Sequence, residues 1–451
     1  MRPFVALSLL VACGVVSAAT GDAATATLYA DATVIDGTGA APEPHQDILV
    51  RGERIVATGA HGSLAGADAA HARIVDLRGR FVIPGLIDTH VHLATPPDLP
   101  RARAALRRNL YGGVTAVRDM ADDLRPVGEL AREARMAEIP SPDIYYAALM
   151  AGPAFFADPR VAAASAGLQP GTAPWMQAID ERTDIARAVT LARGTSATAI
   201  KIYADLPPEL VAAITREAHR QGMRAWAHGA VFPARPQAVV DAGVDVVSHA
   251  CYQAYEVQKT IPQAYEDHTP VDERLLAPDG NDPVLARLYA DMRERGTLLD
   301  ATGSLFVRHD ALRKSHPEMK PLRCSGAATT RIVRQAWQAG IPVSTGTDDD
   351  GEREDPWPPL FAEIEFLVRD VGMSPLQALH SATQVGARAA AQDADMGTIE
   401  AGKLADFVVL AKDPSADIGN LRSIVSTVKR GKDHPRADYR PITREEWGND
   451  D

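Results

Sequence analysis

Two histidines spaced one residue apart, His90 and His92, end the apolar segment PGLIDTHVHL at residues 84–93. Successive side chains of a strand point to opposite faces, so both imidazoles would lie on the same side of a strand. Crowding disfavours protonation of both rings, whereas a shared divalent cation favours the two neutral rings. The chain has 13 histidines, so such a pair also arises by chance, and a metal site needs further ligands.

Four further polar groups stand at the ends of predicted strands. They are Lys201 in AIK, His228 in AWAH, His249 in VVSH and Asp348 in TGTD. Taken alone, each has a structural explanation, such as a lysine that reaches water, a hydrogen-bonded core histidine or a capping aspartate. Together with the histidine pair, they give a pattern that is typical of an active site built at the C-terminal ends of barrel strands.

The elements that must position these groups alternate in type. From residue 84, apolar stretches of strand length alternate with amphipathic stretches of helical length. The candidate strands are LIDTHVHL, VTAVRDM from 114, DIYYAALMA from 143, AIKIYA from 199, RAWAHGA from 224, VDVVSHAC from 244, TLLDATGS from 297 and PVSTGTD from 342. This α/β pattern predicts a (β/α)8 TIM barrel over residues 84–395. A doubly wound open sheet is the alternative, but no GxGxxG motif follows the first strand.

Strand-rich segments flank the predicted barrel. Residues 26–83 contain short strands joined by Gly and Asp turns, which we expect to form a small antiparallel unit, and β-character returns over 396–432. Insertions at 152–180 and 252–282 follow the third and sixth barrel strands, so we expect them to form walls or lids of the site. Residues 433–451 are polar, and we expect a surface tail there.

The composition limits the class of partner. The chain has 451 residues, 46% of them hydrophobic, and can bury a large core. A formal net charge of -12 argues against nucleic acid or an anionic membrane and favours a small-molecule substrate. We expect a homo-oligomer. Beyond the first 25 residues only Cys251 and Cys324 remain, so no disulfide framework is expected.

The N-terminus has the layout of an export signal. Arg2 is the only charged residue of the first 19, an apolar run follows it, and small residues come next. The run is too short to span a bilayer, so residues 1–19 predict a signal peptide, cleaved after Ala18 or Ala19, and a periplasmic protein. The segment LVAC at 10–13 leaves an alternative, a lipobox in which Cys13 becomes a lipid anchor.

At this point the sequence resembles a known family. PGLIDTHVHL, the SH of the sixth strand, the GTD of the eighth and GTIEAGKLADFVVL are together similar to the amidohydrolase superfamily, over about residues 26–432. The resemblance is closest to its binuclear members with a carboxylated lysine, the imidazolonepropionase-like and Xaa-Pro dipeptidase-like group. It implies that residues 26–83 and 396–432 pair into one small β-sandwich domain beside the barrel.

The resemblance also implies a site with two divalent metal ions. One ion would be held by His90, His92 and Asp348, and the second by His228 and His249. Imidazole and carboxylate ligands suit zinc best, with manganese, cobalt or nickel as alternatives.

Lys201 would bridge the two ions as a carbamate formed with CO2, together with a hydroxide. A buried lysine beside two cations cannot easily keep its charge, so its pKa should fall and the neutral amine can add carbon dioxide. Asp348 would take a proton from the nucleophile and pass it to the leaving group. Asp348, Lys201 and His228 are therefore the predicted catalytic residues.

The expected reaction is hydrolysis. Relatives that deaminate nucleobases carry a glutamate three residues after the histidine of the fifth strand, where this chain has Val231. We therefore expect cleavage of an amide or peptide C–N bond in a dipeptide or N-acyl amino acid, with prolidase-like activity first. The second enzymatic hypothesis is a lactone, carbamate or phosphotriester hydrolase. The non-enzymatic hypothesis is a periplasmic binding protein on a degenerate barrel.

Four side chains near the predicted barrel mouth are candidates for recognising a carboxylate or polar tail of the substrate. They are Arg118, Tyr203, Tyr252 and Arg308.

Overall fold

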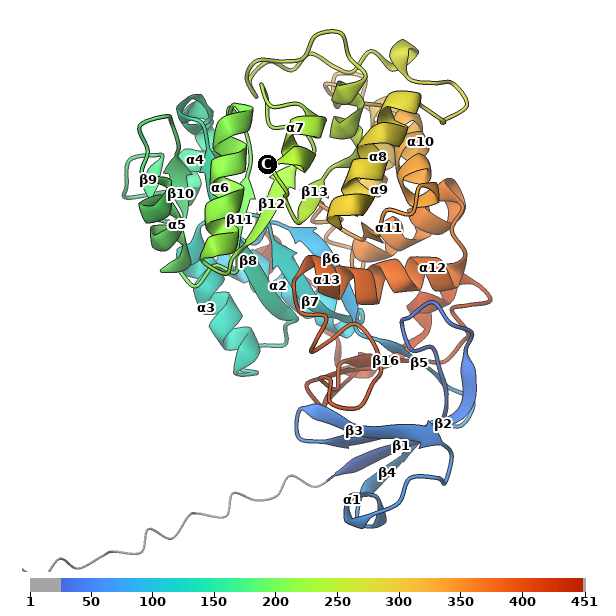
Figure 1. Ribbon diagram of the computed structural model, residues 1–451. Coiled ribbons are helices and arrows are strands. Elements are labelled where there is room, and N and C mark those ends of the chain that lie inside the picture. Colours follow the sequence, from blue (N-terminus) through green and yellow to red (C-terminus); the bar gives the residue numbers. More distant parts are fainter. Residues whose placement is uncertain (1–25, 449–451) are drawn as a thin grey trace, which may run out of the picture.

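The computed structural model describes residues 26–448, which form a barrel and a smaller sheet below it (Figure 1). The predicted signal peptide at 1–19 and the lipobox cysteine Cys13 lie outside the described residues. No helix within residues 26–448 is both long and apolar enough to cross a membrane.

Eight parallel strands form the barrel in the order in which they occur along the chain. They are β6 (Leu86–Val91), β7 (Val114–Asp119), β8 (Asp143–Ala151), β11 (Ala199–Ile202), β12 (Arg224–His228), β13 (Val246–Ser248), β14 (Leu298–Asp300) and β15 (Val343–Ser344). The first and last strands meet where the Thr89 amide donates to the Thr345 carbonyl and the Asp348 amide donates to the His90 carbonyl, each at 2.9 Å. The predicted TIM barrel is thereby confirmed, strand for strand.

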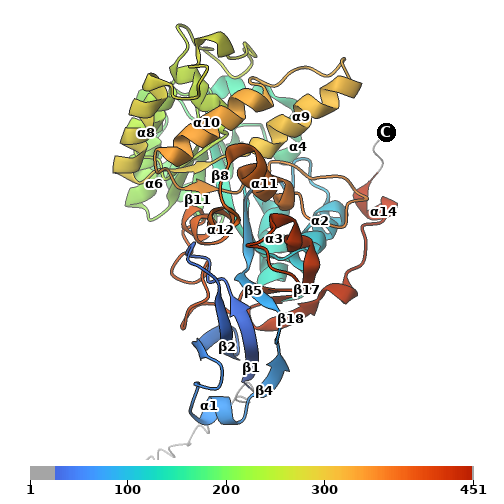
Figure 2. The same cartoon turned by 90° about the vertical axis from the view of Figure 1, so that its right-hand side faces the viewer.

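Helices surround the barrel on its outer face (Figures 1 and 2). The principal helices are α2 (Leu99–Tyr111), α3 (Leu124–Arg135), α5 (Ile185–Arg193), α6 (Pro208–Arg220), α7 (Pro236–Asp241), α8 (Pro283–Arg295), α9 (Gly303–Ser315), α10 (Gly326–Gln338), α11 (Leu360–Phe366), α12 (Pro375–His380) and α13 (Gly386–Ala389). Their starts follow local chemistry: Asp98 caps α2 by accepting from the Arg101 amide, and Ser325 caps α10 by accepting from the Ala328 amide. The apolar faces of these helices pack on the strands and leave the strand ends for polar groups.

The two ends of the described chain join in one mixed sheet of eight strands. They are β1 (Thr27–Val34), β2 (Glu43–Arg51), β3 (Arg54–Ala60), β4 (Arg73–Asp76), β5 (Phe81–Pro84), β16 (Phe407–Leu410), β17 (Ile424–Lys429) and β18 (Lys432–Pro435). The pairing of β5 with β16 joins the two segments, as the family resemblance implied. The expected antiparallel unit needs a correction, because the short helix α1 (Ala67–Ala70) returns the chain so that β4 runs parallel to β1, and β5 is also parallel to β1.

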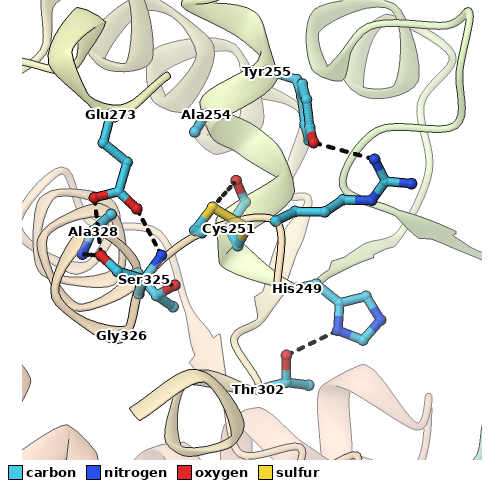
Figure 3. Close-up of a disulfide and its surroundings, with 12 residues drawn as sticks. His249, Cys251, Ala254, Tyr255, Glu273, Thr302, Ser325, Gly326 and Ala328 are labelled. Carbon is cyan, nitrogen blue, oxygen red and sulfur yellow. Dashed lines mark hydrogen bonds between the residues drawn. A yellow bond between two sulfur atoms is a disulfide. The ribbon is translucent and has the colours of Figure 1, made fainter. Parts of the chain in front are cut away.

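The two insertions lie at the C-terminal end of the barrel, as predicted. The first contains η1 (Pro153–Ala157), α4 (Pro159–Ala164), β9 (Thr172–Ala173) and β10 (Met176–Ala178), and the second contains η2 (Ala250–Glu256) and η3 (Glu273–Leu275). A disulfide between Cys251 and Cys324 ties the start of the second insertion to the segment before α10 (Figure 3). The sequence did not imply a disulfide framework, and the fold brings these two cysteines, 73 residues apart, together in a single disulfide.

The last segment of the described chain, residues 436–448, packs against α2 instead of projecting as a tail. It contains η7 (Arg436–Asp438) and α14 (Arg444–Trp447). Ile442 and Trp447 are buried, and they form a small apolar cluster with Ala104 of α2. The polar composition of this segment predicted a surface tail, because its two buried apolar residues are isolated in the sequence.

Candidate metal centre

All six predicted ligands lie at the C-terminal end of the barrel. His90 is in β6, Lys201 is in β11, and His228 is the last residue of β12. His92, His249 and Asp348 follow β6, β13 and β15. Parallel strands in a closed barrel end at one face, and this is why residues so far apart in sequence can meet.

Asp348 stands between three of the imidazoles. Its Oδ1 lies 3.5 Å from His92 Nε2 and 3.8 Å from His90 Nε2, and its Oδ2 lies 3.9 Å from His249 Nδ1. One ligand atom each of His90, His249 and Asp348 can be chosen so that all lie within 4.8 Å of one another. A carboxylate among imidazoles at these separations suits a shared cation.

His228 and Lys201 complete the constellation on the other side. The ring centroids of His228 and His249 are 4.6 Å apart, and those of His90 and His249 are 4.7 Å apart. Lys201 is fully buried, and its Nζ donates to Ser248 Oγ at 3.5 Å. The imidazoles therefore form a continuous row that ends at the ring of His92, 5.6 Å from that of His90.

A buried carboxylate below this row, Asp300 at the end of β14, orients its neighbours. Its Oδ2 lies 2.8 Å from His90 Nδ1 and accepts from Ser248 Oγ at 2.9 Å. Its Oδ1 accepts from Thr89 Oγ1 at 2.9 Å. Gly346 makes room for it, because a Cβ at this position would lie 2.1 Å from Asp300 Oδ1. Asp300 thus fixes the His90 ring with Nε2 turned toward the site.

Two other imidazoles are oriented in the same way. His92 Nδ1 lies 2.8 Å from Asp122 Oδ1. His249 Nδ1 lies 2.9 Å from Thr302 Oγ1 (Figure 3). The backbone is strained here, with φ of 66° at His249, 46° at Thr302 and 51° at Asp348. Left-handed backbone in residues other than glycine is costly, and it concentrates at functional sites.

Burial keeps most of these groups neutral. It lowers the pKa of His90, His228 and His249 well below the usual value, and it lowers the pKa of Lys201 to about 7. Burial also raises the pKa of Asp348 to about 6.

His92 differs from the other histidines. Burial by itself would lower its pKa, but the charge of Asp122 and their hydrogen bond raise the pKa of His92 to about 9.

The donor set fits divalent cations. Neutral imidazoles offer lone pairs, and His228 Nδ1 is buried without a hydrogen-bond partner in the described chain. An unpaired buried nitrogen costs free energy unless a ligand satisfies it. Imidazoles, a carboxylate and an uncharged lysine amine are the donors of a borderline metal ion such as zinc.

The prediction that Arg118 binds substrate is wrong. The side chain is fully buried below the site, where its Nε donates to the Thr89 carbonyl at 2.7 Å and its Nη2 pairs with Asp300 Oδ2 at 3.0 Å. Its guanidinium also stacks on Trp226, 4.3 Å from the ring centroid. The position of Arg118 near the end of a predicted strand suggested that its side chain lies at the barrel mouth. The side chain instead points inward, because it neutralises Asp300.

The other three candidates lie at the mouth. The ring centroids of Tyr203 and Tyr252 are 4.3 and 4.8 Å from that of His228. Arg308 forms ion pairs with Asp349 and Glu352 of the loop after β15. A further side chain from the second insertion, Tyr265, places its hydroxyl 3.2 Å from that of Tyr203.

Three residues of the site, Asp300, Asp122 and Tyr265, were not predicted, and the sequence contains a signal for one of them. Asp300 ends TLLD in the same way that Asp348 ends TGTD, so the strand-end rule applied to it. Asp122 and Tyr265 lie in loops whose path no local pattern predicts.

Comparison with known proteins decides the family. The model of the amidohydrolase family matches residues 81–433, which is most of the chain. The chain belongs to the amidohydrolase family. Its likeness to an ochratoxinase of Aspergillus niger extends over 454 aligned residues at 27% identity and covers 89% of this chain and 84% of the relative. A D-hydantoinase of Streptomyces coelicolor is 32% identical over 98 residues, and this alignment spans only 21% of each chain.

Solved structures of this family share the fold. The A. niger ochratoxinase structure has a TM-score of 0.71 and 20% identity, and the match covers 95% of this chain and 99% of that one. A Xaa-Pro dipeptidase with bound methionine in the active site has a TM-score of 0.71 and 21% identity, with 91% and 100% covered. The comparisons place the chain among hydrolases whose family generally uses divalent metals.

Proposed function

We propose that this amidohydrolase cleaves an amide or peptide C–N bond in a dipeptide or N-acyl amino acid, with Xaa-Pro dipeptides first among the substrates. The observation that carries the proposal is the meeting of four imidazoles, Lys201 and Asp348 at one end of the barrel. The similarity to an ochratoxinase and a Xaa-Pro dipeptidase supports an amide substrate.

Two divalent ions, zinc in our proposal, would supply an activated water and polarise the scissile carbonyl. His90, His92 and Asp348 would hold one ion, and His228 and His249 the other. Asp348 is the proposed general base: its carboxylate oxygen takes the proton of the attacking water and delivers it to the nitrogen that leaves. Burial raises its pKa to about 6, which makes it a stronger base than an exposed aspartate.

Lys201 is the proposed bridging ligand in its carboxylated form. With a pKa near 7, a large fraction of its amine is neutral and can attack carbon dioxide. A nitrogen–carbon bond forms, one proton leaves to water, and the product is an anionic carbamate. The group then offers oxygen donors where a protonated amine would repel both cations.

Aromatic side chains would orient the substrate. Tyr203 and Tyr252 flank His228 and can present hydroxyl donors and flat ring faces to the groups on either side of the scissile bond. Arg308 is engaged with two carboxylates of the loop after β15, so we assign it to holding that loop.

A substrate panel tests the proposed function. It contains Xaa-Pro dipeptides, other dipeptides, N-acyl amino acids, lactones, carbamates and phosphotriesters, with Asp348→Asn as the inactive control. We expect the highest kcat/KM on a dipeptide or N-acyl amino acid. Turnover confined to lactones, carbamates or phosphotriesters would contradict the proposed amide substrate. If no substrate is hydrolysed and the reconstituted protein holds less than about one metal ion per chain, a binding protein is favoured.

Export is proposed as well. The disulfide between Cys251 and Cys324 suits an oxidising compartment. Fractionation of cells should recover the protein in the periplasm, and Cys13→Ser should release it from membranes if the lipobox is used. Recovery in the cytoplasm with free thiols would contradict export. The homo-oligomer stays a prediction, which light scattering after size-exclusion chromatography checks.

A further inference from the structure

The loop that carries Asp348, which we call the base loop (residues 348–359), contains no helix or strand. Six of its first eight residues are acidic, so mutual repulsion favours an open loop unless cations hold it. The general base stands at its first position. Whatever orders this loop therefore bears on where the base points.

Helix α2 supplies the central anchor of the base loop. Arg108 is buried, and its guanidinium donates to the carbonyl oxygens of Asp350, Glu352 (2.7 Å) and Asp355. The planar fork of an arginine can reach several carbonyls at once, which an ammonium group cannot do with the same geometry. Gly351, with φ of 69°, lets the loop turn around the guanidinium.

A second arginine of α2 holds the same turn from outside. Arg101 Nη2 pairs with Asp350 Oδ2 at 2.9 Å. The two arginines thus hold the loop through both its main chain and a side chain, and both contact Asp350, two residues after Asp348.

The C-terminal segment, residues 436–448, lies behind these arginines. The ring of Trp447 lies 4.2 Å from the guanidinium carbon of Arg101 and 5.4 Å from that of Arg108. Glu446 fixes the position of this ring, because its two oxygens accept from Arg107 of α2 at 2.9 Å each. Stacking on a tryptophan restrains long arginine side chains that otherwise sample many rotamers.

The same segment also touches the far end of the base loop. Arg436 Nη2 donates to the Pro356 carbonyl at 2.9 Å, and its guanidinium carbon lies 4.0 Å from the centroid of the Trp357 ring. The segment therefore reaches the base loop directly at Arg436 and through the α2 arginines at Trp447.

We propose that residues 436–448 are a brace that positions the base loop, with Arg108 and Trp447 as positioning residues for the hydrolytic step. The inference rests on the proposed role of Asp348. Within the described chain, the contacts of residues 436–448 reach α2 and the base loop and not the six predicted ligands. Loss of the brace should therefore lower kcat by loosening the position of Asp348 while KM stays nearly constant.

Two substitutions with matched controls test the brace. Arg108→Lys keeps the charge and loses the fork, and its control is Arg103→Lys on the same helix, where Arg103 pairs with Glu133 of α3. Trp447→Ala removes the stacking surface, and Trp447→Phe restores an aromatic ring. Each metal-loaded variant is compared for kcat, KM, metal content and amide hydrogen exchange in residues 349–359.

We expect Arg108→Lys to lower kcat by about 10- to 100-fold with KM changed less than about twofold. Trp447→Ala should lower kcat by about fivefold, and Trp447→Phe should recover most of it. Both losses should come with faster exchange in the base loop, whereas Arg103→Lys should match the wild type in both measurements. If Arg108→Lys does not fold, the comparison of Trp447→Ala with Trp447→Phe still tests the brace.

Two outcomes overturn the brace. Wild-type exchange in both Arg108→Lys and Trp447→Ala would mean that the segment does not order the loop, and faster exchange with unchanged kcat would mean that the order of the loop does not serve turnover. If the wild type hydrolyses only a lactone or phosphotriester, the proposal of an amide substrate is contradicted. The kcat and KM of the same variants, measured on that lactone or phosphotriester, then still test the brace. If the wild type hydrolyses none of the substrates, both the proposed function and the positioning role are contradicted. Amide hydrogen exchange would then still show whether residues 436–448 order the base loop.

Discussion

The two ends of the barrel differ in how they bury their cationic side chains. At the N-terminal end, buried Asp143 pairs with Lys429 at 2.7 Å and also with Arg430 of β17 and its turn. At the C-terminal end, buried Lys201 has a hydroxyl neighbour at 3.5 Å, and His228 Nδ1 has no partner among the described residues. Each buried cation at the N-terminal end therefore faces a carboxylate, whereas Lys201 and the unpartnered His228 nitrogen at the C-terminal end are donors that a ligand can satisfy.

The largest effect should come from the unmatched lysine. Lys201→Ala should lower kcat/KM by about 1000-fold or more, because the proposed bridging group is lost. Short carboxylic acids such as acetate or propionate should restore part of the activity by replacing the carbamate. The control is Lys429→Ala, the buried lysine at the opposite end, which should keep kcat. Wild-type turnover in Lys201→Ala would rule out the bridging role.

A smaller loss is expected from the carboxylate below the imidazoles. Asp300→Asn keeps the shape but removes the charge that orients His90 and neutralises Arg118. Activity or metal affinity should fall by about 10- to 100-fold. Asp47→Asn is a matched control, since Asp47 is a buried carboxylate 2.8 Å from His61 Nδ1 in the small sheet. Equal losses in both variants would show general destabilisation instead of a role at the site.

The acidic limb of the pH profile should report Asp348. A base acts as its carboxylate, and burial raises the pKa of Asp348 to about 6, so kcat should fall about tenfold per pH unit below the limb. Bound cations favour the carboxylate, which places the limb at or below about pH 6. Metal content must be followed at each pH, because protonation of the imidazoles releases metal. A limb above pH 7 with metal retained would contradict this assignment.

The smallest effect on catalysis is expected at the paired end. Asp143→Asn leaves Lys429 and Arg430 buried with one carboxylate fewer, which should cost about 3–5 kcal/mol of unfolding free energy. The value of kcat at 25 °C should stay within about twofold, because the pair lies at the opposite end from the site. Denaturant unfolding and steady-state kinetics measure both quantities. A large loss of kcat in a folded variant would break the distinction between the two ends.

Much of the barrel was predictable because each strand is an apolar run bounded by turn residues. The meeting of the six predicted ligands was foreseeable because these residues end those runs, and parallel strands end at one face. The bond from Asp122 to His92 and the approach of Tyr265 to Tyr203 depend on loop paths, which no periodicity encodes.

The errors have a common cause. Arg118 was assigned to the barrel mouth from its position along the chain, and two cysteines alone do not indicate a disulfide. The burial of Arg118 and the pairing of the cysteines both depend on contacts distant in sequence. Trp447 was one aromatic residue in a polar segment, and its partners on α2 lie more than 300 residues earlier.

The joining of β5 to β16 has a consequence for how the protein is made. The strand that accepts residues 407–410 is complete by residue 84, so during synthesis its hydrogen-bonding edge waits for more than 300 residues to follow. Export in an extended state would postpone the pairing until the whole polypeptide has crossed. Nascent chains halted before residue 407 should therefore depend most on chaperones, and a circular permutant with its new ends in a surface loop of the barrel should depend on them least.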